Sequence, residues 1–115
     1  MKILIAGSRD IDNFDLEAYI PKEVTLIISG GAKGVDTLAE KYADKHKLSK
    51  LILRPNYARY GKAAPILRNR EMVDLADKVI IVWNGTSRGT NQTLDYAKST
   101  EKDVSLIIPD PNSGK

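Results

Sequence analysis

Residues 24–36 read VTLIISGGAKGVD, an apolar run that stops at a glycine-rich loop and continues into a helical pattern. The run over residues 24–28 is rich in β-branched side chains and lacks sustained polar alternation, which is typical of a strand covered on both faces. Over residues 34–47 the apolar side chains recur at helical spacing, with charged residues opposite them. This order of strand, loop and helix predicts part of a βαβ unit.

The same order recurs along the whole chain. Apolar runs predict five strands, at residues 2–6, 24–28, 51–53, 79–83 and 104–108. Helical patterns predict helices at residues 14–20, 34–47, 64–76 and 90–99, of which the first is the weakest. Because alternating strands and helices form right-handed crossovers, we expect an α/β fold: a single Rossmann-like three-layer domain with a mainly parallel five-stranded sheet. The domain is predicted over residues 1–109, with a flexible tail over residues 110–115.

Composition excludes several classes of site. The 115 residues, 42% hydrophobic and 29% charged, are ordinary for a globular protein. The absence of cysteine excludes disulfides and thiolate metal sites, and with His46 as the only histidine we expect no metal and no cofactor. The net charge of +3 is spread, so it permits an anionic ligand without indicating duplex DNA. With no run as long as a membrane span or a signal peptide, we expect a cytoplasmic protein without membrane partners.

Glycine-rich loops follow three of the predicted strands. They are residues 7–10 (GSRD), 29–36 (SGGAKGVD) and 84–90 (NGTSRGT). In a parallel sheet all such turns lie at the carboxyl edge, where ligands bind beside the point at which strand order reverses. Glycine lets backbone N–H groups approach an anion, and the following helix presents its positive end. Hydroxyl donors and cations accompany the glycines, namely Ser8, Ser87 and Thr90, and Arg9, Lys33 and Arg88. The three loops together predict one anion-binding pocket.

The third connection adds aromatic and basic residues. Tyr60 lies in an aromatic and basic stretch, and Arg68 and Asn69 follow in the next predicted helix. These side chains either stack on a base and reach the pocket, or cover the sheet edge and remain solvated. Trp83, at the end of the fourth predicted strand, is also a candidate for ligand stacking, although core or rim packing is favoured for it.

The sequence predicts no catalytic residue. His46 lies late in a helix with a lysine on each side, which favours a solvated position. Asp10 and Asp36 are the acids inside the glycine loops, and Asp36 falls in the first helical turn, where capping is its favoured role. The loops do not match the P-loop pattern of nucleoside triphosphatases.

At these residues the chain resembles the SLOG superfamily of Rossmann-like proteins, and within it the short DUF2493 branch related to YspA and YpsA. The resemblance rests on residues 7–9, 29–36, 60–65 (YGKAAP), 68–72 (RNREM) and 83–90 (WNGTSRGT). It implies a nucleotide-type ligand site on these loops and a dimer or higher homo-oligomer. The related LOG enzymes carry a glutamate just after the Gly-Thr of their second glycine loop. Here Gly89 and Thr90 are followed by no acid until Asp95, which argues against N-glycosidic hydrolysis.

We therefore expect the chain to bind a nucleotide or nucleotide-derived, phosphate-bearing small molecule, as a sensor or sequestering module. The candidate ligand-binding residues are Gly7, Ser8, Arg9, Gly30, Gly31, Ala32, Gly34, Asp36, Tyr60, Arg68, Asn69, Trp83, Gly85, Ser87, Gly89 and Thr90. One alternative is an enzyme that cleaves a nucleotide's glycosidic or phosphate bond with Asp10, Asp36 or Asp95 as acid or base. The other is single-stranded DNA binding, as in the similar DprA proteins.

Overall fold

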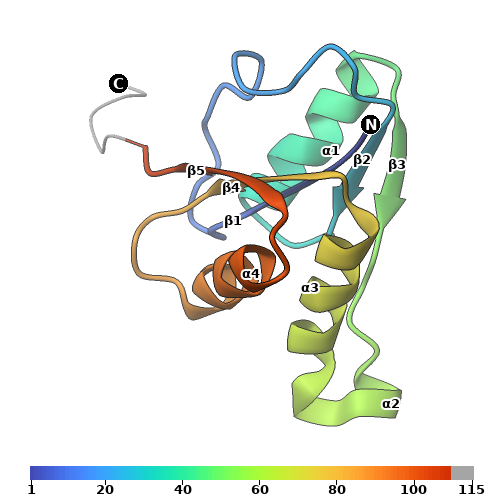
Figure 1. The fold of residues 1–115 in the computed structure, drawn as a ribbon, viewed down its shortest axis with the longest axis vertical. Helices are drawn as coiled ribbons and strands as arrows, with labels where there is room; N and C mark the ends of the chain where they lie inside the picture. Colours follow the sequence, from blue (N-terminus) through green and yellow to red (C-terminus); the bar gives the residue numbers. More distant parts are fainter. Residues whose placement is uncertain (110–115) are drawn as a thin grey trace.

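The computed structural model describes residues 1–109 and contains a five-stranded parallel sheet in the order β3-β2-β1-β4-β5 (Figure 1). The strands are β1 (Lys2–Gly7), β2 (Leu26–Ser29), β3 (Ser49–Ile52), β4 (Lys78–Val82) and β5 (Asp103–Ile107). The helices are α1 (Val35–Lys45), α2 (Tyr57–Tyr60), the 3-10 helix η1 (Gly61–Ala63), α3 (Ala64–Leu75) and α4 (Arg88–Ser99). The predicted α/β, Rossmann-like fold is confirmed, and the predicted tail at 110–115 lies outside the described residues.

Helices cover both faces of the sheet, so each central strand buries side chains on two sides. Helix α1 packs on one face, and its buried residues join alternate positions of β1 such as Ile3 and Ile5 in one core cluster. Helices α3 and α4 lie beside each other on the opposite face (Figure 1), where Leu4 and Ala6 of β1 join a second cluster. The near-continuous apolar runs of the sequence reflect this double burial.

The prediction of a helix over residues 14–20 is wrong. The Asp15 carboxylate accepts a hydrogen bond from the Glu17 backbone N–H at 2.9 Å, a local turn that competes with helix formation. Pro21 follows directly and disfavours helical geometry at Ile20. The segment nevertheless buries Leu16 and Ile20 on the same face of the sheet as α1, so it completes the layer without being a helix.

Several boundaries also differ from the expectation; for example, β2 begins two residues later than predicted and β3 two residues earlier. The segment before α3 forms α2 and η1, and the Asn56 side chain caps α2 by accepting from the Arg59 N–H at 3.1 Å. Helix α4 begins at Arg88, two residues before the predicted start. The earlier start places the first turn of α4 inside the third glycine-rich loop.

The strand order reverses between β1 and β4. The chain runs from β1 outward to β2 and β3, and then crosses to β4 and β5 on the other side of β1. In open parallel sheets the crevice outside this reversal is where ligands bind. A Cβ atom on Gly7 would lie 2.1 Å from the Val82 carbonyl oxygen, so only glycine allows β1 and β4 to meet this closely at the crevice. No helix within residues 1–109 combines the length and apolarity needed to cross a membrane.

Candidate functional site

A cavity of about 320 Å³ lies at the reversal of strand order. Four parts of the chain contribute to it: the end of β1 with the loop after it, the loop after β2 with the start of α1, the first three turns of α3, and the start of α4. Its lining residues are Ala6, Gly7, Arg9, Ala32, Asp36, Pro65, Arg68, Asn69, Met72, Ser87, Gly89, Thr90 and Thr93.

The amino end of α4 opens onto this cavity. Ser87 precedes the helix without a side-chain cap, and the first helical hydrogen bond runs from the Asn91 N–H to the Ser87 carbonyl at 3.2 Å. The N–H groups of Arg88, Gly89 and Thr90 therefore have no partner within the helix. The Thr90 side chain, on a residue that is 7% exposed and lines the cavity, also makes no hydrogen bond within residues 1–109. These donors coincide with the positive end of the helix dipole.

The guanidinium of Arg68 is held in a fixed position beside the cavity. Its Nη1 donates to the Gly30 carbonyl at 2.8 Å and to the Leu53 carbonyl at 3.1 Å, while Nε donates to Asn69 Oδ1 at 2.8 Å. Burial lowers the pKa of Arg68, which remains charged at neutral pH because arginine titrates far above it. Across the described chain, Arg68 Nη2 and Asn69 Nδ2 have no hydrogen-bond partner, so both retain donor capacity.

Asp36 introduces a carboxylate into the same cavity. Burial raises its pKa, although a hydrogen bond from the Ala32 N–H at 3.1 Å and the nearby charge of Arg68 act in the opposite direction. A Cβ atom on Gly30 would lie 2.8 Å from Arg68 Nη1 and 2.9 Å from Asp36 Oδ2. Gly30 therefore makes room for these two charged side chains.

Ser8 joins two of the glycine-rich loops from a buried position. Its Oγ accepts from the Asn84 N–H at 2.9 Å and lies 3.3 Å from the Ser87 Oγ. The Asn84 side chain extends the connection, because its Nδ2 donates to the Asp10 carboxylate at 3.0 Å and its Oδ1 accepts from the Ser87 N–H at 3.0 Å. Sequence analysis missed this role of Asn84, although an asparagine directly before a glycine is a common turn signal.

The other glycines of these loops differ in what surrounds them. Gly34 has φ of 74°, and a Cβ atom there would lie 2.4 Å from the Ser8 carbonyl oxygen and 2.5 Å from that of Arg9. This close approach brings the first and second loops together. Gly89 differs, because nothing lies within 4 Å of the position that a Cβ atom would take there. The sequence predicted that the glycines leave room for an anion. The open space beside Gly89 fits that prediction, whereas the space beside Gly34 is filled by backbone carbonyls.

The structure brings some of the predicted site residues together and not others. The cavity is lined by Gly7, Arg9, Ala32, Asp36, Arg68, Asn69, Ser87, Gly89 and Thr90. Outside its lining lie Ser8, Gly30, Gly31, Gly34, Tyr60, Trp83 and Gly85. The Trp83 Nε1 donates to the Ser87 carbonyl at 3.0 Å and its ring packs against the core beneath α3 and α4, so it supports the third loop. Tyr60 lines a separate hollow with Arg54 and Leu67.

Four lining residues were missed by sequence analysis: Ala6, Pro65, Met72 and Thr93. Ala6 and Met72 read as core residues, and both are buried. Thr93 lies one helical turn beyond Gly89, whose carbonyl accepts a hydrogen bond from its hydroxyl at 3.0 Å. Spacing along α4 would have identified Thr93, had the helix start been placed at Arg88.

Comparison with models of known families matches residues 1–60 to the YspA, cpYpsA-related SLOG family. The chain belongs to this family. The matched part covers just over half of the chain and holds the first two glycine-rich loops. No curated protein matches the sequence.

A solved structure supports the same fold for the whole SLOG chain. The X-ray structure of DNA processing protein A (DprA) from Streptococcus pneumoniae superposes with a TM-score of 0.71 at 20% sequence identity. The match covers 98% of this chain and 52% of the DprA chain. The chain thus spans about half the length of that protein, and the likeness concerns the fold alone.

Proposed function

We propose that the chain binds a nucleotide or nucleotide-derived small molecule, with a phosphate group of the ligand at the amino end of α4. The observation that carries this proposal is the convergence of unpaired donors on one cavity. The N–H groups of Gly89 and Thr90, the Thr90 hydroxyl and Arg68 Nη2 all belong to residues that line it. A phosphate oxygen is a strong acceptor that matches such a set of donors.

The charge of the lining favours a monoanion or dianion. Arg9 and Arg68 contribute two positive charges and Asp36 one negative charge, so the lining is net positive by one. The positive end of α4 adds to this field. A cavity of about 320 Å³ is at the lower end of the range for small-molecule sites, which suits one phosphate and a sugar.

Thr90→Val tests the proposal without disturbing the fold. Valine keeps the shape of threonine, and the Thr90 hydroxyl that it removes makes no hydrogen bond within residues 1–109, so the melting temperature should change little. A lost hydrogen bond to a charged oxygen should weaken ligand binding by about tenfold or more. The matched control is Thr100→Val at the other end of α4, which should leave the affinity unchanged.

The measurement is calorimetry, after a thermal-shift screen of nucleotides, cyclic dinucleotides and ADP-ribose derivatives. A ligand that binds the folded state raises the melting temperature by mass action. No response across the panel, or equal affinity of the wild type and Thr90→Val, would contradict the proposal.

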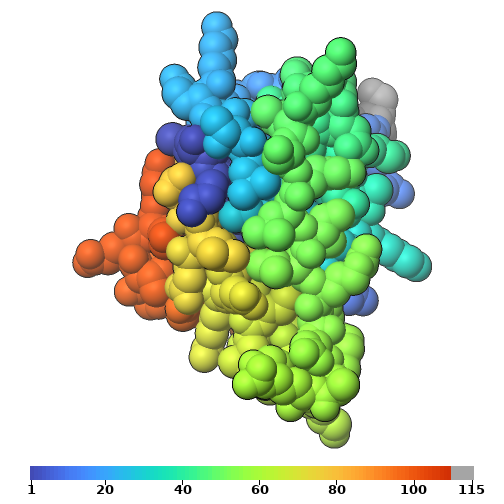
Figure 2. Space-filling view, turned by 90° about the vertical axis from the view of Figure 1, so that its right-hand side faces the viewer, coloured from blue at the N-terminus to red at the C-terminus, as the bar shows by residue number. Residues whose placement is uncertain are grey.

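Single-stranded DNA binding is a second candidate, supported by a different surface. Helix α2 projects at one end of the molecule (Figures 1 and 2), and its Tyr57 and Tyr60 are 58% and 43% exposed. The Arg59 guanidinium lies 5.2 Å from the centre of the Tyr60 ring. Exposed aromatic rings beside cations are the usual platform for unpaired bases.

Arg59→Gln separates the two candidates. DNA binding predicts oligonucleotide affinity that falls steeply with salt and weakens in Arg59→Gln. Small-molecule binding in the cavity predicts an affinity that Arg59→Gln leaves unchanged, since Arg59 does not line it.

A further inference from the structure

A groove of about 360 Å³ runs between α3 and α4 and adjoins the cavity. The two spaces share Asn69 of α3 and Thr93 of α4 among their lining residues. Beyond this shared boundary the groove continues along α4 past Gln92 and Tyr96 to Ser99. A ligand bound in the cavity therefore lies next to the groove.

The groove differs from the cavity in charge. Its charged lining residues are Arg70 and Asp95, which cancel, whereas the cavity lining carries an excess positive charge. The groove also follows the second half of α4, toward the negative end of the helix dipole. A phosphate is therefore favoured in the cavity, and an uncharged group is favoured in the groove.

The chemistry of the groove suits a flat, polar ring. The Tyr96 ring lies 5.5 Å from the Arg70 guanidinium, and its hydroxyl donates to Asp74 at 2.8 Å, so the ring is held in place. Amide and carboxylate groups of Gln92 and Asp95 offer donors and acceptors from the same helix face. At the junction, the Asn69 amide keeps its Nδ2 hydrogens unused within residues 1–109, because Arg68 occupies only its Oδ1.

On the assumption that the proposed phosphate site is correct, we propose that the α3–α4 groove is the subsite for the nucleobase of the same ligand. The ligand is then a nucleoside phosphate that lies along α4, with its phosphate at Gly89 and its base beside Tyr96. Tyr96 lies seven positions after Gly89 along the helix, a rise of roughly 10 Å, which is comparable to the length of a nucleoside monophosphate from its phosphate to the far edge of its base. This orientation assigns selection of the base to Gln92, Asp95 and Asn69.

The test compares ribose 5-phosphate, which has no base, with the four common nucleoside 5′-monophosphates by calorimetry. The wild type should bind at least one monophosphate about tenfold more tightly than ribose 5-phosphate, as expected for one stacked and hydrogen-bonded base. Gln92→Trp fills the groove from an exposed helix position and should abolish this advantage while leaving ribose 5-phosphate affinity unchanged. Asn91→Trp, which replaces the neighbouring exposed amide outside the groove lining, should leave both affinities unchanged.

The outcomes separate this inference from the proposed function. If Gln92→Trp retains the advantage of the nucleotide, or if no monophosphate binds better than ribose 5-phosphate, the groove is not the base subsite and the phosphate site stands. If neither ribose 5-phosphate nor any monophosphate binds the wild type, both proposals are overturned. Far-ultraviolet circular dichroism and melting temperature confirm that each tryptophan variant is folded.

Discussion

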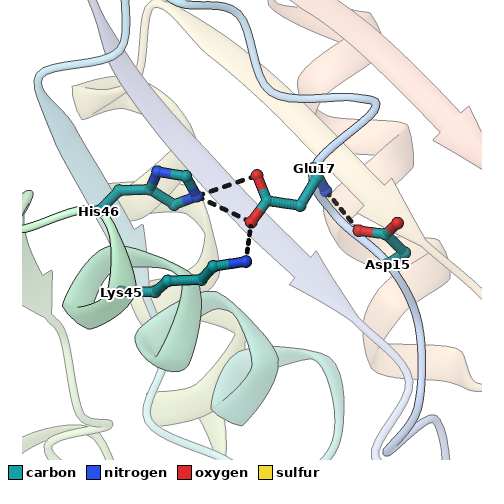
Figure 3. A network of polar contacts seen from close by, with 4 residues as sticks. All are labelled: Asp15, Glu17, Lys45 and His46. Carbon is teal, nitrogen blue, oxygen red and sulfur yellow. Dashed lines mark hydrogen bonds and ion pairs between the residues drawn. The ribbon is translucent and has the colours of Figure 1, made fainter.

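The two edges of the sheet treat their polar groups differently. At the amino edge, where α1 ends, polar side chains pair with one another: the Glu17 carboxylate lies 2.9 Å from Lys45 Nζ and 2.8 Å from His46 Nε2 (Figure 3). The Asp77 carboxylate likewise accepts from the Lys2 N–H at 2.8 Å. These contacts hold the segment over residues 11–20 and the starts of the strands in place. The groups that make them are therefore already used in hydrogen bonds within the protein.

At the carboxyl edge the polar groups are held in place with capacity left over. Arg68 uses Nε and Nη1 on Asn69 Oδ1 and two backbone carbonyls, and Nη2 has no partner within residues 1–109. Within residues 1–109, the Thr90 hydroxyl likewise makes no hydrogen bond, and the first N–H groups of α4 have no partner within the helix. Preorganised but unused donors, rather than the number of charges, thus distinguish the proposed binding edge from the structural one.

The largest expected effect comes from the close approach that creates the carboxyl edge. Gly7→Ala places a methyl group 2.1 Å from the Val82 carbonyl and 2.6 Å from a Val35 methyl, both inside the core. We expect a loss of at least about 3 kcal/mol in the free energy of unfolding, measured by chemical denaturation. Gly89→Ala is the control, because its Cβ position is open and alanine favours a helix, so it should stabilise by up to about 1 kcal/mol. If both substitutions changed the free energy of unfolding equally, the difference in packing between Gly7 and Gly89 would be contradicted.

Asp36→Asn sharpens the comparison by removing the one negative charge from the cavity lining. Asparagine keeps an oxygen for the Ala32 N–H, so the loop should hold. The affinity for inorganic pyrophosphate, measured by calorimetry, should rise by about tenfold, as expected for the loss of one nearby like charge in a medium of intermediate dielectric. A fall in affinity would instead mean that the Asp36 carboxylate itself contacts the ligand.

The stability difference between the wild type and Asp36→Asn should depend on pH in a defined direction. Because burial raises the pKa of Asp36 above 3.8, the folded state binds its proton more tightly than the unfolded state does. The wild type therefore loses stability relative to Asp36→Asn as the pH rises from about 4 through the folded-state pKa. Above that pKa the difference should be constant, which urea denaturation at several pH values will show.

The smallest effect is expected at the amino edge. Hydrogen bonds from Lys45 and His46 lower the pKa of the exposed Glu17 carboxyl below 4.5. A lowered pKa stabilises the folded state above the unfolded value of the group, and this contribution disappears as the pH falls through the folded value. Glu17→Gln should therefore lower the melting temperature slightly at pH 7, with a smaller difference at pH 3 and in 1 M salt. Pyrophosphate affinity should not change; if it does, the two edges are not independent.

Sequence analysis predicted the fold from patterns that burial dictates. Runs such as residues 79–82 lack polar alternation because helices cover both faces, and the spacing of Val35, Ala39 and Ala43 reflects one buried helix face. The same reasoning wrongly predicted a helix over residues 14–20. Leu16 and Ile20 are buried at helical spacing, but the turn formed by the Asp15 side chain and the proline at position 21 keep the segment irregular.

For the candidate site, the sequence indicated the loops but not the contacts between them. Parallel topology alone places the loops after β1, β2 and β4 at one edge. Which glycine faces a carbonyl and which faces open space depends on distances between segments that are remote in sequence, as Gly34 and Gly89 show. The anchoring of Arg68 by the Gly30 and Leu53 carbonyls likewise has no local signal.

The central claim is that a phosphate binds the amino end of α4, and amide chemical shifts test it most directly. In a titration of the ¹⁵N-labelled protein with ribose 5-phosphate, the largest saturable shifts are expected at the N–H groups of Gly89 and Thr90. Amides of Lys45 and His46 at the amino edge should remain unshifted. Saturable shifts that cluster at the amino edge, or the absence of any at Gly89 and Thr90, would contradict the account.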